Sequence, residues 1–343
     1  MSVKSWEDVS IYQKDVSRII TNSFRLNRIS HAYIFEGPNG TKKSSTAMLF
    51  AKSLLCTNPN NFNPCNECHS CRRVDNLTHP NLFYIKPKGK VIKKEQIQSL
   101  INEFSKTSIE NGPRVYIIEE ADKLNLTSAN TLLKTMEEPG MGIYQVLVTE
   151  SYNSLLKTII SRAETLHFTP IDRNIIKKHL IKQNISPNIA NAVSEYTADM
   201  GAAIHIAEDF EMINIIKLAI EIHNTYLVKN LSSIILFKEN NKDVFKSPAI
   251  TDFFLTLMIF YQKDILNYQL RHLVNICFEE ELETIKKLSE KISQKHIEEN
   301  ITKMLGLKSR LKYNINNKLA FDKMLACLER GYKYATYCSS DTV

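Results

Sequence analysis

A segment that nearly matches a phosphate-binding loop constrains the fold of this chain more than any other feature. It spans residues 37–44 and reads GPNGTKKS, whereas the standard motif is G-x-x-x-x-G-K-[ST]. In that motif backbone N–H groups surround the phosphates, the lysine reaches the terminal phosphates and the hydroxyl holds Mg²⁺. Gly37, Lys43 and Ser44 occupy motif positions, but Lys42 stands at the second glycine. Because that glycine lets the backbone approach the phosphates closely, the sequence predicts a nucleotide-binding fold with an altered nucleotide site.

The flanking segments supply the context that this motif requires. Residues 31–36 form an apolar run that predicts a buried strand, and residues 44–55 have the spacing of a helix. Further strands are predicted at residues 114–118 and 144–149, with a helix at 128–138 between them. Strands that alternate with amphipathic helices indicate a parallel α/β sheet.

Strand signals stop near residue 170, and the rest of the chain predicts helices. Residues 172–183 form a basic helix, and Ser186 and Pro187 are a suitable N-cap and first position for the next one. Beyond residue 211 wide apolar faces predict helices that pack on one another. The sequence therefore predicts an α/β domain, a small helical domain and an all-α domain, at residues 1–170, 171–209 and 210–343.

Four of the seven cysteines lie close together in the sequence. They are Cys56, Cys65, Cys68 and Cys71. Four thiolates satisfy tetrahedral Zn²⁺ without an open position, which is the arrangement of a structural site. His69 lies inside the cluster and is an alternative ligand, although we expect it to be a solvated neighbour. A coincidental group of thiols seldom has this C-x-x-C spacing, so we predict a zinc module at about residues 56–75.

Two acidic residues follow the strand predicted at residues 114–118. An ATPase usually has an aspartate there for Mg²⁺ and a glutamate for the attacking water. Glu119 stands at the aspartate position with a longer side chain, and Glu120 matches the glutamate. An acidic helix cap is the simpler alternative. Lys42 and Glu119 together predict weakened or lost hydrolysis and leave ATP binding open. The candidate nucleotide-binding residues are Gly37, Gly40, Lys43, Ser44, Glu119 and Glu120.

An arginine follows the strand predicted at residues 144–149. Ser161 and Arg162 close the segment LLKTIISR at residues 155–162. An arginine at a subunit edge can stabilise γ-phosphate charge in a neighbouring active site, an effect of roughly 10³–10⁵ in rate. An isolated arginine of this kind more commonly makes a surface salt bridge.

Composition and charge narrow the class of protein. The 343 residues are 43% hydrophobic and 24% charged, which is ordinary for a soluble globular protein. The net charge of +7 is weak evidence for nucleic acid when it is dispersed over such a surface. The N-terminus lacks a signal-peptide pattern, and the longest apolar run, at residues 253–261, is too short to span a bilayer. We therefore expect a cytoplasmic protein with no membrane partner.

Several segments of the chain resemble those of a known family. The segments RISHAY at residues 28–33 and NTLLKTMEEP at 130–139, with the cysteine insertion and the acidic strand end, are similar to the delta-prime subunits of bacterial DNA polymerase III clamp loaders. Residues 155–162 resemble the Ser-Arg-Cys motif of that family, with Ala163 in place of the cysteine. The resemblance is specific over residues 1–170, extends to about 210, and is only topological beyond.

The resemblance implies a fold and a role in DNA replication. Members have an AAA+ module of a P-loop domain and a helical lid, followed by a helical collar that joins five subunits in a ring. A delta-prime chain would assemble with gamma/tau and delta subunits to place the sliding β clamp on primed DNA. It would have no intrinsic enzyme activity. By the same resemblance Arg162 would be an arginine finger that acts in trans, and Ser161 would fix its loop.

Three departures from an ATPase support this assignment over a gamma/tau-like motor. They are Lys42, Glu119 and the absence of a lid arginine in the segment GAAI at residues 201–204. An autonomous ATPase that uses Lys43, Ser44 and Glu120 stays the alternative. A P-loop nucleotide kinase is disfavoured, because a kinase needs neither the Ser161–Arg162 loop nor a long helical C-terminal domain.

Overall fold

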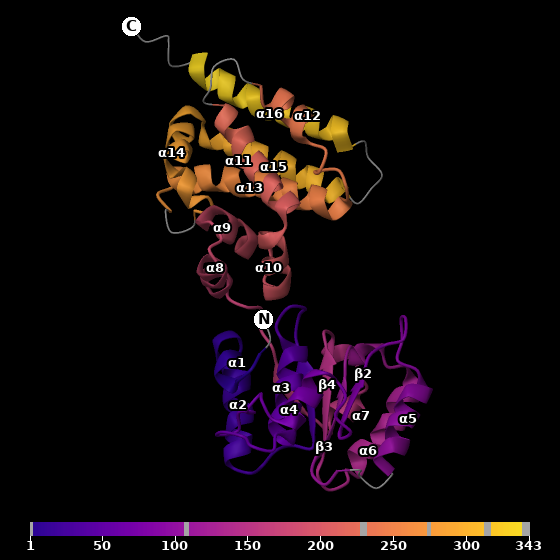
Figure 1. The fold of residues 1–343 in the computed structure, drawn as a ribbon. Coiled ribbons are helices and arrows are strands. Elements are labelled where there is room, and N and C mark those ends of the chain that lie inside the picture. Colours follow the sequence, from indigo (N-terminus) through magenta and orange to yellow (C-terminus); the bar gives the residue numbers. More distant parts are fainter. Residues whose placement is uncertain (1–2, 106–109, 227–231, 273–275, 312–316, 338–343) are drawn as a thin grey trace. The chain divides into compact units, whose positions relative to one another are not determined.

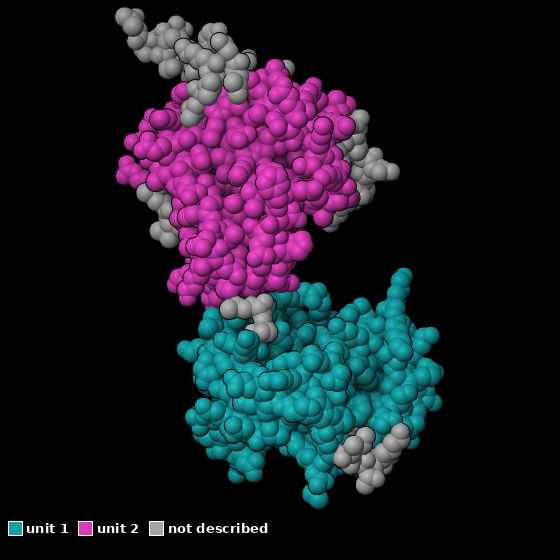
Figure 2. Space-filling model, in the orientation of Figure 1, with its two compact units in different colours: residues 1–172 teal, residues 173–343 magenta. Residues whose placement is uncertain are grey.

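The chain divides into two compact units, residues 1–172 and 173–343 (Figure 2). The computed structural model describes residues 3–105, 110–226, 232–272, 276–311 and 317–337. The sequence-based division at 170 and 209 into P-loop, lid and collar domains stays a prediction.

Unit 1 is built on a five-stranded parallel sheet in the order β2-β3-β4-β1-β5. In Figure 1, where β2, β3 and β4 are labelled, the sheet lies between α1 and α2 on one side and α5 and α6 on the other. The strands are β1 (Ala32–Glu36), β2 (Leu82–Ile85), β3 (Arg114–Ile118), β4 (Ile143–Thr149) and β5 (Glu164–His167). β1 lies between β4 and β5, with Ile34 opposite Leu147 on one side and opposite Thr165 on the other. Because all strands run the same way, the residues that follow β1 and β3 meet at one edge of the sheet.

Helices cover both faces of this sheet. They are α1 (Trp6–Tyr12), α2 (Lys14–Arg25), α3 (Lys43–Leu55), α4 (His69–Asp75), α5 (Lys94–Ser105), α6 (Leu126–Glu137) and α7 (Lys157–Ile160), with short 3-10 helices η1 (Ala121–Lys123) and η2 (Tyr152–Ser154). Alternate residues of a strand point to opposite faces. Tyr33 and Phe35 pack with α1, α2 and α3, whereas Ala32 and Ile34 pack with α5, α6 and α7.

The N-terminal helices α1 and α2 pack on one face of the sheet, and the residue between them contacts the segment that follows β5. Ser5 and Asp8 form a capping box at the start of α1. The Gln13 side chain, between α1 and α2, donates to the Thr41 carbonyl at 3.2 Å and to the Thr169 carbonyl at 2.7 Å. Segments distant in the sequence are thereby joined beside the phosphate loop.

Unit 2 consists of helices. They are α8 (Arg173–Lys182), α9 (Pro187–Tyr196), α10 (Met200–Glu208), α11 (Phe210–Thr225), α12 (Ser233–Asn240), α13 (Pro248–Gln269), η4 (Glu279–Glu281), α14 (Leu282–Lys291), α15 (Gln294–Arg310) and α16 (Asn317–Tyr337). α13 has 22 residues and packs against α11, α14 and α15. The rings of Phe237, Phe254 and Phe321 pack together with centroids 5.5–5.9 Å apart, which joins α12, α13 and α16.

The predicted α/β class with a parallel sheet is confirmed, and so is the strand–loop–helix context of the phosphate loop. Ser186 and Pro187 take the predicted cap and first positions of α9. The strands β2 and β5 and the helices α1, α2, α4 and α7 were not predicted. In the part of the chain that the structure describes, no helix is long and apolar enough to cross a membrane.

Candidate functional site

The phosphate loop connects β1 to α3 and keeps the backbone conformation of a glycine-rich turn. Gly37 has φ +152°, and a Cβ there would lie 2.2 Å from the Phe168 carbonyl oxygen, so only glycine fits. Gly40 has φ +79°. Lys42, at the motif's second glycine, lies in the left-handed region with φ 69° and ψ 20° and is the N-cap of α3. The loop therefore has the expected shape, with a side chain where the motif has none.

The motif lysine is buried against its own loop. Lys43 is 6% exposed, and its Nζ donates to the carbonyl oxygens of Gly37 at 2.6 Å and Pro38 at 2.7 Å. Burial lowers the pKa of Lys43, and nearby carboxylates, of which Glu150 contributes most, oppose that shift. A phosphate group would have to displace these carbonyl contacts to reach the ammonium group.

The structure brings Ser44 and Glu119 together. The Ser44 hydroxyl donates to Glu119 Oε1, and the Tyr84 hydroxyl donates to Glu119 Oε2 at 2.9 Å. Burial and the adjacent carboxylate of Glu119 raise the pKa of Tyr84, which keeps this phenol protonated as the donor. Ser44 and Glu119, the two groups that would hold Mg²⁺, are thus hydrogen-bonded to each other. Both carboxylate oxygens of Glu119 accept hydrogen bonds from protein groups.

Glu120 is not part of this arrangement. It has a left-handed backbone with φ 51°, and its carboxylate pairs with Lys123 in η1. Asp122 accepts a hydrogen bond from Thr149 Oγ1 at 3.0 Å. Of the two acidic residues predicted at the strand end, only Glu119 contacts the phosphate loop through a described hydrogen bond.

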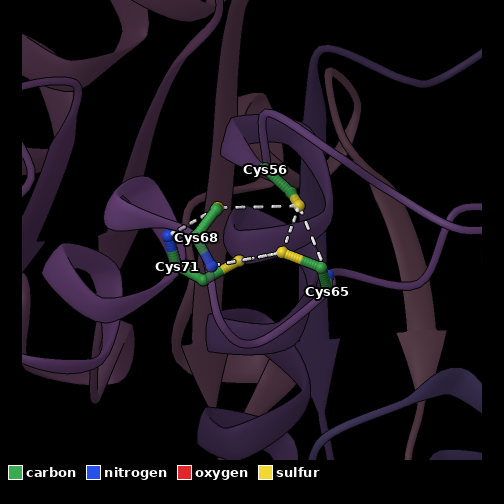
Figure 3. Close-up of side chains that lie close together, drawn as sticks. All are labelled: Cys56, Cys65, Cys68 and Cys71. Atoms are coloured by element: carbon green, nitrogen blue, oxygen red, sulfur yellow. Dashed lines mark hydrogen bonds between the residues drawn. The ribbon is translucent and has the colours of Figure 1, made fainter.

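The four cysteines converge at the end of α3 (Figure 3). Their sulfur atoms all lie within 4.8 Å of one another. The Sγ–Sγ distance is 3.6 Å for Cys56 and Cys65, 4.0 Å for Cys56 and Cys68, and 3.9 Å for Cys65 and Cys71. Tetrahedral zinc with bonds of about 2.3 Å requires sulfur atoms about 3.8 Å apart. The cluster therefore fits a Zn²⁺ ion, and His69 is an exposed neighbour.

Hydrogen bonds from backbone N–H groups lower the pKa of Cys65 and Cys68 in this cluster, whereas burial raises the pKa of Cys56 and Cys71. The N–H groups of Cys65, Cys68 and Cys71 each donate to the sulfur of the preceding cysteine of the cluster at 3.3 Å. Burial raises the pKa of Cys68, but hydrogen bonds from Thr57 and from the Cys71 N–H outweigh it and lower that pKa to about 5. The resulting thiolate is the form that binds a metal.

The cysteine segment is fastened to α3 by polar contacts. Lys52, which is 6% exposed, pairs with Asp75 at 2.5 Å and donates to Asn66 Oδ1 at 3.2 Å. Ser70 Oγ donates to the Leu55 carbonyl at 2.5 Å. These contacts join α4 and the cysteine loop to the helix that begins at the phosphate loop.

Arg162 lies just after α7 with its side chain 36% exposed. Its Nη1 donates to the Thr158 carbonyl at 3.0 Å and to Ser161 Oγ at 3.2 Å. Its Nη2 lies 2.9 Å from Glu137 Oε1, at the end of α6. The Ser161 hydroxyl therefore accepts a hydrogen bond from Arg162, and Glu137 is a further partner of the guanidinium. The role of these residues at a neighbouring active site stays a prediction.

Sequence reasoning missed Tyr84 and Glu137. Tyr84 reaches Glu119 because β2 pairs with β3, a pairing that no local pattern reveals. Glu137 lies inside the segment NTLLKTMEEP that carried the family resemblance. Its position at the end of a predicted helix gave no indication of which side chain it contacts.

Comparisons with known proteins agree on one family. A family model described as "DNA polymerase III, delta subunit" matches residues 12–172. DNA polymerase III subunit delta' of Bacillus subtilis is 32% identical over 327 residues, which cover 95% of this chain and 99% of the relative. The delta' subunit of Pseudomonas aeruginosa is 35% identical over 39% of this chain and 41% of its own length. The tau/gamma subunit of Haemophilus influenzae is 33% identical over 52% of this chain and 25% of its own length. This chain therefore belongs to the family of DNA polymerase III delta' subunits.

Proposed function

We propose that this chain is the delta' subunit of the clamp loader of DNA polymerase III, an AAA+ subunit that does not itself hydrolyse ATP. It assembles in the cytoplasm with gamma/tau and delta subunits into a five-membered ring that places the sliding β clamp on primed DNA. Its similarity to a delta' subunit along nearly its whole length supports this assignment, and its similarity to tau/gamma subunits supports the choice of partners.

The single observation that carries the proposal is the contrast between the chain's own phosphate loop and Arg162. Lys43 donates hydrogen bonds to carbonyl oxygens of its own loop, and Ser44 donates a hydrogen bond to Glu119. Arg162 is a partly exposed arginine at the end of a short helix. The groups for binding a nucleotide are hydrogen-bonded within their own unit, while the guanidinium that can stabilise a transferring phosphoryl is partly exposed.

Under this proposal each predicted domain has a separate task. Residues 1–170 present the arginine, residues 171–209 serve as the lid, and residues 210–343 form the collar that joins the subunits. Within the collar, residues 227–231, 273–275, 312–316 and 338–343 lie outside the described residues. Zn²⁺ held by the four cysteines is structural, because four thiolates leave no position for water or substrate.

Reconstitution of the complex tests the role of Arg162. We expect Arg162→Ala to lower hydrolysis at the one site it serves by roughly 10³–10⁵, the range for arginine fingers. The total ATP turnover of the complex should fall by the fraction that this one site contributes. Size-exclusion chromatography should show that the ring still assembles. The isolated chain should not turn over ATP.

Arg18→Ala is a matched control, because Arg18 is also a surface arginine paired with a carboxylate, that of Asp15. It should leave turnover unchanged. If the complex with Arg162→Ala hydrolyses ATP as fast as the parent complex, Arg162 is not an arginine finger. ATP hydrolysis by the isolated chain would instead favour an autonomous ATPase.

A further inference from the structure

The guanidinium of Arg162 is held from two directions. Thr158 and Ser161, which accept from Nη1, belong to the same short segment as the arginine. Glu137, which pairs with Nη2 at 2.9 Å, is the last residue of α6 and comes from a separate part of the chain. Among the contacts of the described residues, the Glu137 contact is therefore the one that relates the direction of the guanidinium to the rest of unit 1.

The helices that carry this ion pair are fixed to each other by the core. Leu132 and Met136 of α6 are 0% and 2% exposed, and Ile159 of α7 is fully buried in the same hydrophobic cluster. The backbone positions of Glu137 and Arg162 are thus set by packing, and the ion pair then sets the side-chain conformation. A group placed by rigid elements is positioned more accurately than one on a free side chain.

The pair contributes little to the fold itself. The side chains of Arg162 and Glu137 are 36% and 49% exposed, and ion pairs at such positions are weak and screened by salt. These contacts also use only some of the N–H donors of the guanidinium, so others can meet a phosphate oxygen. The ion pair therefore matters more for the orientation of the Arg162 guanidinium than for the stability of the fold.

We propose that Glu137 is a positioning residue for Arg162, which pre-orients the guanidinium for the γ-phosphate bound by the neighbouring subunit. This inference rests on the proposed function of Arg162. An arginine side chain that is already ordered loses less conformational freedom when it engages the phosphate. Its removal should therefore affect the hydrolytic step without affecting how the complex binds ATP.

Variants of Glu137 in the reconstituted complex test this. We expect Glu137→Ala to lower the kcat of the site served by Arg162 by roughly 2- to 12-fold, the range for ordering one long side chain. The KM for ATP, ring assembly and the thermal unfolding midpoint of the isolated chain should be those of the parent. Glu137→Gln keeps an oxygen that accepts from Nη2 and should retain most of the kcat. Glu138→Ala, at the adjacent residue, is the control and should leave kcat unchanged.

A double-variant cycle separates positioning from a general structural role. If Glu137 acts through Arg162, Glu137→Ala should have no further effect in the Arg162→Ala background. An additional loss there, or parental or higher kcat in Glu137→Ala alone, would overturn the inference and leave the role of Arg162 intact. If Arg162→Ala itself keeps full turnover, the proposed function fails and this inference fails with it.

Discussion

Lys42 has a backbone conformation that lysine rarely adopts. Its φ of 69° lies in the left-handed region, which costs an L-residue roughly 1–2 kcal/mol because the Cβ approaches the following carbonyl oxygen. The Lys42 carbonyl nevertheless accepts hydrogen bonds from the N–H and the hydroxyl of Thr46, both at 2.9 Å. The buried strand β1 and helix α3 therefore impose the turn, and the lysine tolerates it.

Restoring the motif glycine should stabilise unit 1. We expect Lys42→Gly to raise the free energy of unfolding by about 0.5–1 kcal/mol, because relief of the left-handed strain exceeds the entropy that glycine adds to the unfolded chain. Urea unfolding followed by circular dichroism measures this. Lys42→Ala keeps the Cβ and should gain little. An equal gain in both variants would mean that loss of the lysine side chain, and not relief of strain, is responsible.

The cysteine cluster begins where helix α3 ends and is attached to that helix. Cys56 is the C-cap of α3, and Lys52 within that helix is bonded to Asn66 and Asp75 beyond it. A metal at the four sulfur atoms therefore connects the far end of this helix to α4. Since α3 begins at the phosphate loop, one helix joins the two candidate sites.

Metal analysis and hydrogen exchange test this connection. The parent should contain about one Zn²⁺ per chain, and Cys68→Ser or a strong chelator should remove it. Amide exchange should then increase over residues 56–75 and the last turn of α3, while β3 and β4 stay protected. Cys327→Ser, outside the cluster, should retain the metal. A parent without metal, or a Cys68→Ser variant that still holds it, would contradict the assignment.

The strands show where sequence reasoning succeeds and where it does not. β1, β3 and β4 are mostly apolar and are buried on both faces of the sheet, with Gln145 the polar exception inside β4, so their composition indicates them. β5 reads ETLH, and only Leu166 is buried. It is a strand because it pairs with β1, and such a long-range pairing has no local signal.

The same distinction applies to the candidate site. The cysteine cluster was predictable because its ligands are close in sequence, and the structure brings all four together. The contact between Ser44 and Glu119 follows from the order of parallel strands. Tyr84 and Glu137 were not predictable, because their partners depend on strand register and on the packing of α6 against α7.

Unit 2 contains a buried carboxyl group that links the stability of the fold to pH. Asp264 in α13 is 1% exposed and accepts from the N–H groups of Cys277 and Phe278 at 2.8–3.0 Å. Burial raises its pKa to about 7 although these hydrogen bonds oppose that shift. A carboxyl group with a raised pKa in the folded state stabilises at low pH, and that contribution is lost as the pH rises toward 8.

Replacement of this carboxyl should therefore change the pH profile. Between pH 5.5 and 8.0 the parent should lose up to about 2 kcal/mol of unfolding free energy through Asp264, and Asp264→Asn should not. The stability of the variant relative to the parent should thus improve with pH, whatever the fixed effect of the amide. Urea unfolding at the two pH values measures the difference. Parallel profiles would show that Asp264 is ionised throughout this range.

The pairing of β5 with β1 also has a consequence for protein synthesis. β1 ends at Glu36, but its second neighbour, β5, ends at His167, and Gln13 finds its partner at Thr169. At about 5–20 residues per second, the ribosome needs roughly 7–26 s to translate the residues between the end of β1 and the end of β5. During this time the nascent strand beside the phosphate loop has an open edge, which can pair wrongly with other chains. Unit 1 can complete its sheet only when translation is about to begin on unit 2.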